Sequence, residues 1–325
     1  QAEHTFHREH YTILMQSIRT AIVGLGNIAH GYDDIPSIKK RMQYPTHLSV
    51  LKKDKRFVLV AASDVSPRAR TVFKKKVSRV VTLYADYRVM LKKKDIDLLV
   101  VAVPTDAHFK VCSDALKAGI KNIICEKPIT QTLNEAAKLH ALVKHYRARI
   151  MINYQRSYSR GCEKFISSMR KNRWGRISSV IVRYNNGIFN TATHLIHLLE
   201  RMFGPIQRVQ SITKRVRGQA DPNISFTAFT RDNSLFFEGV DGLEYRLFEI
   251  DIKFTKKRMV LNSDSYINTS MRDVYVNACQ AIRNNKKTAG DLASAIHALK
   301  VAAMAVASAK TGKLLRVWHD KSISN

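Results

Sequence analysis

A short β-rich run that ends in a glycine turn is the feature that most constrains the fold of this chain. Residues 18–23 read IRTAIV, and GLGNIA follows at once. Gly24, Gly26 and Ala29 therefore satisfy G-x-G-x-x-A directly after a strand, where a dinucleotide-binding turn requires it. The first glycine permits the tight turn, and the second lets the backbone approach a pyrophosphate bound by the N–H groups of the following helix. Alone the motif is weak, because small residues after a strand also occur for packing.

A second strand-like run, residues 57–64, ends in an acid and supports this interpretation. In a doubly wound sheet an acid at this position hydrogen-bonds the adenosine ribose, normally about 20 residues after the glycines. Asp64 lies 38 residues after Gly26, because residues 30–45 form an insertion rich in proline and charge before a helix-like run at 46–56. The order of the elements therefore survives although the spacing is broken.

The length and the order of the patterns predict two domains. A chain of 325 residues is longer than one hydrophobic core usually supports. Strand-like and helix-like runs alternate over the first 150 residues, which indicates an α/β domain with a doubly wound parallel sheet. Later strand-like runs have few helices between them, which indicates an α+β domain with an open, mainly antiparallel sheet. We expect a disordered extension at 1–17, a dinucleotide-binding Rossmann domain at 18–154, and a substrate and oligomerisation domain at 155–325.

The charge of the chain is its one unusual bulk property. Lys and Arg number 55 against 26 Asp and Glu, a formal net charge of +29. Such an excess is compatible with nucleic-acid binding, with an anionic substrate, or with a host organism whose proteins are generally basic. The basic runs are spread along the whole chain, with no aromatic-interleaved basic motif and no zinc or helix-turn-helix signature. We therefore interpret most of them as solvated faces and expect no nucleic-acid partner.

Cysteine usage and hydropathy indicate a cytoplasmic protein. The four cysteines stand far apart without CxxC spacing, which argues against a zinc site or a disulfide framework. We see no signal peptide. The most apolar window, 292–309, contains His297 and Lys300 and has helical periodicity, so we expect a packed helix and no membrane partner.

Further motifs follow the glycine turn in a fixed order. These are the acid at Asp64, PTDAH (104–108), CEKP (125–128), NYQR (153–156), a G-x-x-x-x-x-x-H helix from Gly187 to His194, and SAKTGK (308–313). Together they resemble the Gfo/Idh/MocA family of nicotinamide-dependent sugar and cyclitol oxidoreductases, over roughly residues 17–317.

The resemblance implies a role for particular side chains. Lys127 would lie beside the nicotinamide and hydrogen-bond the reacting hydroxyl, and His194 matches the family's catalytic histidine. Arg156 and Tyr158 would line the substrate pocket. The residues expected at the dinucleotide are Gly24, Gly26, Asn27, Ile28, Ala29, Asp64, Arg68, Pro104, Thr105, His108, Glu126 and Lys127.

Two positions depart from the family pattern, which carries an aspartate four residues before the histidine and another three after it. Here Asn190 and His197 occupy these positions. Asn190 shares a helical face with His194 and could hydrogen-bond the substrate, but it is not a base at neutral pH. His194 by itself could equally be a packed helix histidine. We expect His197 to be structural and no metal to be bound, because a His194/His197 zinc pair lacks a convincing third ligand.

These patterns predict an NAD(P)-dependent oxidoreductase that transfers a hydride between nicotinamide and a secondary alcohol of a sugar, sugar acid, nucleotide sugar or cyclitol. Asp64 favours NAD, because a carboxylate repels the 2′-phosphate of NADP, whereas Arg68 could pair with that phosphate. Lys39, Lys40 and Arg41 of the insertion could face an anionic substrate. We expect a homodimer or homotetramer formed through the C-terminal sheet. A noncatalytic dinucleotide-binding regulator is the alternative, and a nucleic-acid-associated role is a more distant one.

Overall fold

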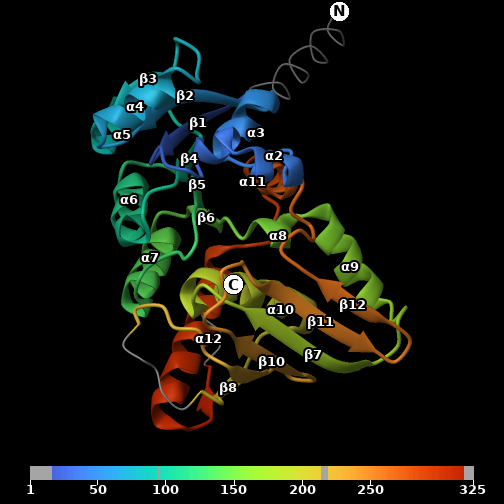
Figure 1. Cartoon of the computed structure of the whole chain (residues 1–325). Helices are drawn as coiled ribbons and strands as arrows, with labels where there is room; N and C mark the ends of the chain where they lie inside the picture. The colour runs from blue at the N-terminus through green and yellow to red at the C-terminus, as the bar shows by residue number, and fades with distance from the viewer. Residues whose placement is uncertain (1–16, 94, 214–218, 318–325) are drawn as a thin grey trace, which may run out of the picture.

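Two β-sheets, each covered by helices, make up the computed structural model, which describes residues 17–93, 95–213 and 219–317. Figure 1 shows the sheets in separate halves of the molecule. The extension expected at 1–17 lies outside the described residues except for Ser17.

The first sheet has six parallel strands in the order β3-β2-β1-β4-β5-β6. These are β1 (Ile18–Val23), β2 (Phe57–Ser63), β3 (Thr82–Tyr84), β4 (Leu98–Val101), β5 (Asn122–Cys125) and β6 (Arg149–Ile152). The strand order reverses at β1, between β2 and β4, and ligands of open α/β sheets bind beyond the carboxyl ends of the strands at such a point. The predicted doubly wound parallel sheet is confirmed.

Helices bury both faces of this sheet, which explains why its central strands read as continuous apolar runs. In β4, Leu99 and Val101 belong to a core shared with helices α5 (Tyr87–Lys93), α6 (Thr105–Lys117) and α7 (Leu133–His145). Leu98 and Val100 belong to a core shared with α3 (His47–Lys53), α4 (Pro67–Lys74) and α11 (Ser270–Asn284). A helix from the far end of the chain thus completes the cover of the N-terminal sheet.

The second sheet has seven strands in the order β12-β11-β7-β10-β9-β8-β13, and its pairs are antiparallel except for β7 with β10. These are β7 (Ile177–Tyr184), β8 (Arg208–Ser211), β9 (Phe226–Phe229), β10 (Ser234–Gly239), β11 (Phe248–Phe254), β12 (Arg258–Leu261) and β13 (Leu315–Arg316). Val180, Val182 and Tyr184 of β7 are buried, and the residues between them are partly exposed. One face therefore packs on helices and the other stays open, as predicted for this half.

Helices α9 (Arg160–Arg170), α10 (Thr193–Phe203) and α12 (Leu292–Thr311) cover the buried face of the second sheet. The first turns of α12 also pack into the core of the first sheet through Leu292 and Ile296, so this helix joins the two halves. α12 is long and apolar enough to cross a membrane by length and composition, but 61% of its apolar window is buried inside the protein. That burial is what a core helix shows.

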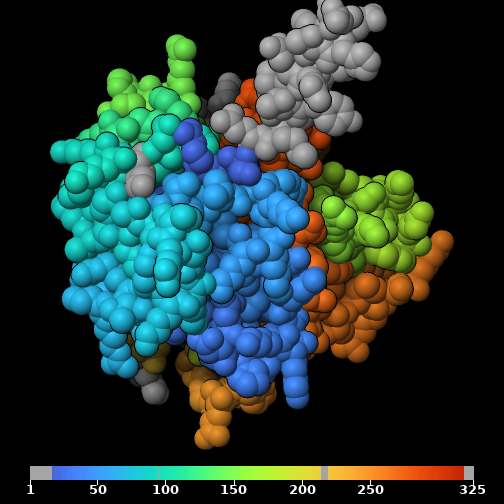
Figure 2. Space-filling model, turned by 90° about the horizontal axis from the view of Figure 1, so that it is seen from above, coloured from blue at the N-terminus to red at the C-terminus, as the bar shows by residue number. Residues whose placement is uncertain are grey.

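The insertion at 30–45 folds as a short 3₁₀ helix, η1 (Gly31–Asp34), and a helix α2 (Pro36–Arg41). It docks against the C-terminal half, because the Gln43 N–H donates to the carbonyl and side-chain oxygens of Asn268, both at 3.0 Å. Figure 2 shows this blue segment lying against orange-red residues of the C-terminal part. The insertion therefore spans the boundary between the two halves.

The helix-like run at 46–56 follows the insertion as α3, as predicted, so no long α-helix begins directly at the glycine turn. The N–H groups of Ala29, His30 and Gly31 all donate to the Gly26 carbonyl, at 3.1, 3.1 and 3.4 Å. These hydrogen bonds close a single turn, and the chain then continues into the insertion at 30–45. The first α-helix of more than six residues is α3, which begins at His47 after a capping box between Thr46 and Ser49.

Candidate active site

The glycine turn is held close to the neighbouring strand. Gly24 has φ of 91°, and a Cβ there would lie 2.5 Å from the Ala102 carbonyl oxygen, so only glycine fits. A Cβ on Gly26 would meet nothing within 4 Å. The backbone is therefore bare where a pyrophosphate has to approach, and this part of the chain fits a dinucleotide.

Asp64 lies at the carboxyl end of β2 and braces this turn. Its Oδ2 accepts the Leu25 N–H and its Oδ1 accepts the Ser66 N–H, both at 2.8 Å. Although the insertion lengthens the spacing in the sequence, Asp64 still lies beside the glycine turn. Arg68, on α4, is exposed.

His108 connects the two loops that follow β4 and β5. Its ring nitrogens lie 2.9 Å from the Val103 carbonyl and 2.8 Å from the Pro128 carbonyl, and the residue is buried. His108 was expected to lie at the dinucleotide. In the structure both of its nitrogens are used to fix the loops around Pro104 and Lys127.

Glu126 directly follows β5 and belongs to a buried network that the sequence did not reveal. It accepts from His47 Nε2 at 3.1 Å and from the Asn153 amide, and His47 Nδ1 lies 3.0 Å from the Tyr275 hydroxyl. Burial alone would raise the pKa of Glu126, but the hydrogen bond and charge of His47, the Asn153 bond and the charge of Lys127 together hold it below its usual value. Glu126 is therefore a fixed anion beside Lys127.

Lys127 is held by the loop that precedes α10. Its Nζ donates to the Asn190 backbone oxygen at 3.1 Å and to the Asn190 side-chain oxygen at 2.6 Å. Burial lowers the pKa of Lys127, the negative charge of Glu126 opposes this, and the charge of Arg246 adds to the lowering. A lysine with a lowered pKa is easier to convert between donor and acceptor forms near neutral pH.

Asp221 fixes the loop that carries Asn190. Its carboxylate oxygens accept the N–H groups of Phe189 at 2.7 Å and Asn190 at 2.9 Å, in a π-helical turn η2 (Ile188–Ala192). Asp221 lies far from this turn in the sequence, so no spacing pattern could have indicated it.

The two histidines of α10 have different surroundings. His194 lines the same cavity as Lys127. Burial, followed by the positive charges of Lys127 and Arg156, holds the pKa of His194 well below its usual value, so its ring is neutral at pH 7.

His197 is set back from that cavity. Its Nδ1 lies 2.8 Å from the Ser157 hydroxyl, its Nε2 lies 3.2 Å from the Ser294 hydroxyl, and its ring stacks on Tyr154 with centroids 4.4 Å apart. Burial lowers the pKa of His197 to about 3. Both ring nitrogens of His197 thus face serine hydroxyls inside the protein, and the residue has a structural role.

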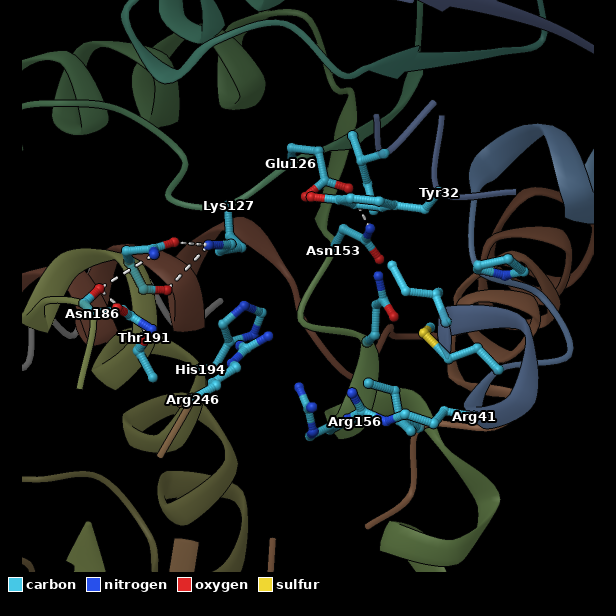
Figure 3. A pocket seen from close by; sticks show the side chains of 17 residues that line it. Tyr32, Arg41, Glu126, Lys127, Asn153, Arg156, Asn186, Thr191, His194 and Arg246 are labelled. Carbon is cyan, nitrogen blue, oxygen red and sulfur yellow. Dashed lines mark hydrogen bonds between the residues drawn. The ribbon is translucent and has the colours of Figure 1, made fainter. Parts of the chain in front are cut away.

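A cavity of about 420 Å³ lies between the two halves and the insertion. Figure 3 shows Lys127, Glu126, His194 and Arg246 around it. Its lining residues are Ile28, Tyr32, Ile38, Arg41, Met42, Pro45, Glu126, Lys127, Asn153, Gln155, Arg156, Asn186, Asn190, Thr191, His194, Arg246 and Ile267.

Not every residue expected in the substrate pocket reaches this cavity. Arg156 and Asn190 line it, whereas Tyr158 is buried elsewhere with its hydroxyl donating to the Gly290 carbonyl at 2.8 Å. Arg156 and Tyr158 stand two apart on helix α8 (Gln155–Tyr158), and residues at that spacing do not share a face.

Of the three basic residues expected from the insertion, only Arg41 lines the cavity. Lys39 and Lys40 are exposed on α2. Within the described residues no group of three or more His, Cys, Asp or Glu could hold a metal ion.

The sequence was compared with a family model and with curated proteins. Residues 18–154 match the model of the oxidoreductase family GFO_IDH_MocA, described as an NAD-binding Rossmann fold. An uncharacterised oxidoreductase of Schizosaccharomyces pombe is 31% identical over 144 residues, which are 44% of this chain and 35% of that protein. The matched region spans less than half the length of this and the other curated relatives.

Solved structures match nearly the whole chain. A myo-inositol dehydrogenase from Corynebacterium glutamicum has a TM-score of 0.76 at 15% identity, covering 93% of this chain and 99% of that one. The WlbA dehydrogenase from Bordetella pertussis, in complex with NADH and UDP-GlcNAcA, has a TM-score of 0.75 at 17% identity, covering 94% and 100%. At such identity these likenesses show the fold alone.

Proposed function

We propose that this chain, whose dinucleotide-binding domain belongs to the Gfo/Idh/MocA oxidoreductase family, is an NAD-dependent dehydrogenase acting on a secondary alcohol of a carbohydrate or cyclitol derivative. The observation that carries the proposal is that Lys127 and His194 line one cavity at the carboxyl ends of the parallel strands, beside the bare glycine turn. This is where an open α/β sheet holds its ligands.

The residues around Lys127 suit recognition of a hydroxyl group. Asn190 already accepts two hydrogen bonds from the Lys127 ammonium, so this side chain is oriented before substrate arrives. Glu126, fixed by His47 and Asn153, supplies the countercharge. A positioned ammonium can donate a hydrogen bond to the substrate oxygen as negative charge develops on it.

We assign the hydroxyl proton to His194. Its lowered pKa keeps the imidazole neutral at pH 7, so one ring nitrogen carries a free electron pair. As the alcohol becomes a carbonyl, the O–H proton passes to that nitrogen, while the C–H electron pair and its hydrogen leave as hydride. Bound oxidised nicotinamide supplies the hydride acceptor. Asn190, which is uncharged, orients the hydroxyl and takes no proton.

Asp64 supports NAD as the preferred dinucleotide. Its carboxylate stands at the end of β2 beside the glycine turn, where it would accept a hydrogen bond from a ribose 2′-hydroxyl and repel a 2′-phosphate. The solved relative with NADH and UDP-GlcNAcA, and the inositol dehydrogenases of the same fold, support a carbohydrate or cyclitol derivative as substrate.

A turnover screen separates this proposal from a noncatalytic dinucleotide-binding regulator. The purified protein is incubated with NAD and a panel of cyclitols, sugars, sugar acids and nucleotide-linked sugars, and NADH formation is followed by absorbance. We expect catalytic NADH formation with at least one panel member. Tight NAD binding without NADH formation from any panel member would favour the regulator.

A further inference from the structure

Three arginine side chains line the cavity in addition to Lys127 and His194. Arg41 comes from α2, Arg156 from α8, and Arg246 from the segment before β11. Together with Lys127 they place four cationic side chains on the cavity wall against the single carboxylate of Glu126. Figure 3 shows Arg41 and Arg156 on one side of the cavity and Glu126 on the other.

Arg156 is buried without its full set of partners. It is 6% exposed, and one terminal nitrogen donates to the Ser263 carbonyl at 2.6 Å. Its Nε–H has no hydrogen-bond partner. Its guanidinium carbon lies 4.3 Å from the centroid of the Phe248 ring. A buried donor left unpaired is destabilising, so a missing acceptor has to be accounted for.

Arg246 lies near the same ring, with its guanidinium carbon 5.8 Å from the Phe248 centroid. Across the described part of the chain, the Arg246 guanidinium forms no salt bridge with any carboxylate within 4.0 Å. Arg41 is different, because it pairs with Asp264. Burial, then the charges of Arg246 and Arg41, lower the pKa of Arg156 to about 9. The three guanidiniums therefore repel one another, and an anion between them would relieve that repulsion.

We propose that Arg156 and Arg246, assisted by Arg41, bind an anionic group of the substrate, either a carboxylate or a phosphate. Guanidinium groups present planar, paired donors that match both of these anions. The proposal rests on the function proposed above and narrows it to acidic carbohydrate derivatives. The substrate would then be held at two points, by the arginines at its anionic group and by Lys127 and His194 at its reacting hydroxyl.

Binding of matched probes tests this subsite without any need for turnover. D-glucuronate, D-glucose 6-phosphate and D-glucose are titrated calorimetrically into the NADH-loaded protein, so that the carboxylate and the phosphate are separated. The variants are Arg156→Met and the more exposed Arg246→Met. Lys40→Met is the matched control, because it removes one positive charge from α2 next to Arg41 but outside the cavity.

We expect at least one acidic probe to bind more than 10-fold tighter than D-glucose, and either arginine variant to lose about 10- to 100-fold of that preference, as for a lost charge-assisted hydrogen bond. Lys40→Met should keep it. No preference for either acidic probe, or an equal loss in Lys40→Met, would overturn the subsite. NADH affinity is measured in the same samples: if it is absent, the proposed function fails, whereas intact NADH binding with no anion preference refutes the subsite alone.

Discussion

Gly187 and Asp221 form a coupled pair on which the position of Lys127 depends. Gly187 has φ of 90°, and a Cβ there would lie 2.1 Å from the Asp221 carboxylate carbon and one of its oxygens. Asp221 in turn accepts the backbone N–H of Asn190, which accepts both hydrogen bonds of Lys127. Gly187→Ala should therefore expel the carboxylate and loosen the loop.

The magnitude can be worked from these contacts. Backbone strain at such a conformation costs about 1–3 kcal/mol for a residue other than glycine. Expelling Asp221 forfeits two charge-assisted hydrogen bonds at about 1.5 kcal/mol each, the low end of the range because the carboxylate is only half buried. Gly187→Ala should then cost about 5 kcal/mol and Asp221→Ala about 3 kcal/mol. The double variant should cost no more than Gly187→Ala, because the clash is gone and the bonds are lost only once.

Urea unfolding of the four proteins of this double-mutant cycle measures the coupling, which we expect to be about 3 kcal/mol. Gly204→Ala is the matched control. Gly204 has φ of 85° at the end of α10, and a Cβ there would meet nothing within 4 Å. Its cost should be strain alone and should add to that of Asp221→Ala. Additive costs for Gly187→Ala and Asp221→Ala, within 0.5 kcal/mol as for independent sites, would refute this reasoning.

Three further outcomes follow from the site. The pKa of His197 is lowered to about 3 in the folded protein. As the pH falls below about 6.5, the His197 ring therefore takes up a proton in the unfolded chain but not in the folded chain. Wild type should lose about 1 kcal/mol more unfolding free energy than His197→Asn between pH 7 and 5.5, and equal losses in urea titrations would count against a buried neutral ring. Wild type should bind NAD more tightly than NADP in dinucleotide titrations and Asp64→Ala should narrow the difference; tighter NADP binding by wild type would contradict the role of the carboxylate. His47→Ala should free Glu126 and lower kcat by about 10-fold or more, as for a group acting through its neighbour, and an unchanged pH–rate profile in this variant would show that His47 does not act through Glu126.

Local patterns predicted the elements that carry the cofactor turn. The run at 18–23 is a strand with the same bounds, because turn residues at its end mark where an apolar β-rich run stops. Motif order also indicated Lys127 and His194, which the fold brings to one cavity.

What the sequence could not predict depends on contacts between distant segments. Asp221 reaches Asn190 from 31 residues away, and His47 reaches Glu126 from 79. Arg246 precedes a strand whose place in the sheet is set by pairing with β7 and β12. The family resemblance implied that Tyr158 lines the substrate pocket, but in the structure its hydroxyl donates to the Gly290 carbonyl. No rule of sequence spacing predicts such long-range contacts.

The measurement that tests the central claim most directly is the single-turnover rate of NADH formation in Lys127→Ala and His194→Asn, with the best substrate of the turnover screen. Lys121→Ala is the matched control, since Lys121 is exposed just before the opposite end of β5. Loss of one positioned acid–base group should lower the rate by about 10²- to 10⁴-fold in each site variant, with NAD affinity near wild type and Lys121→Ala unchanged. Rates within a few-fold of wild type in both Lys127→Ala and His194→Asn would contradict the assignment of these two residues to the reacting hydroxyl.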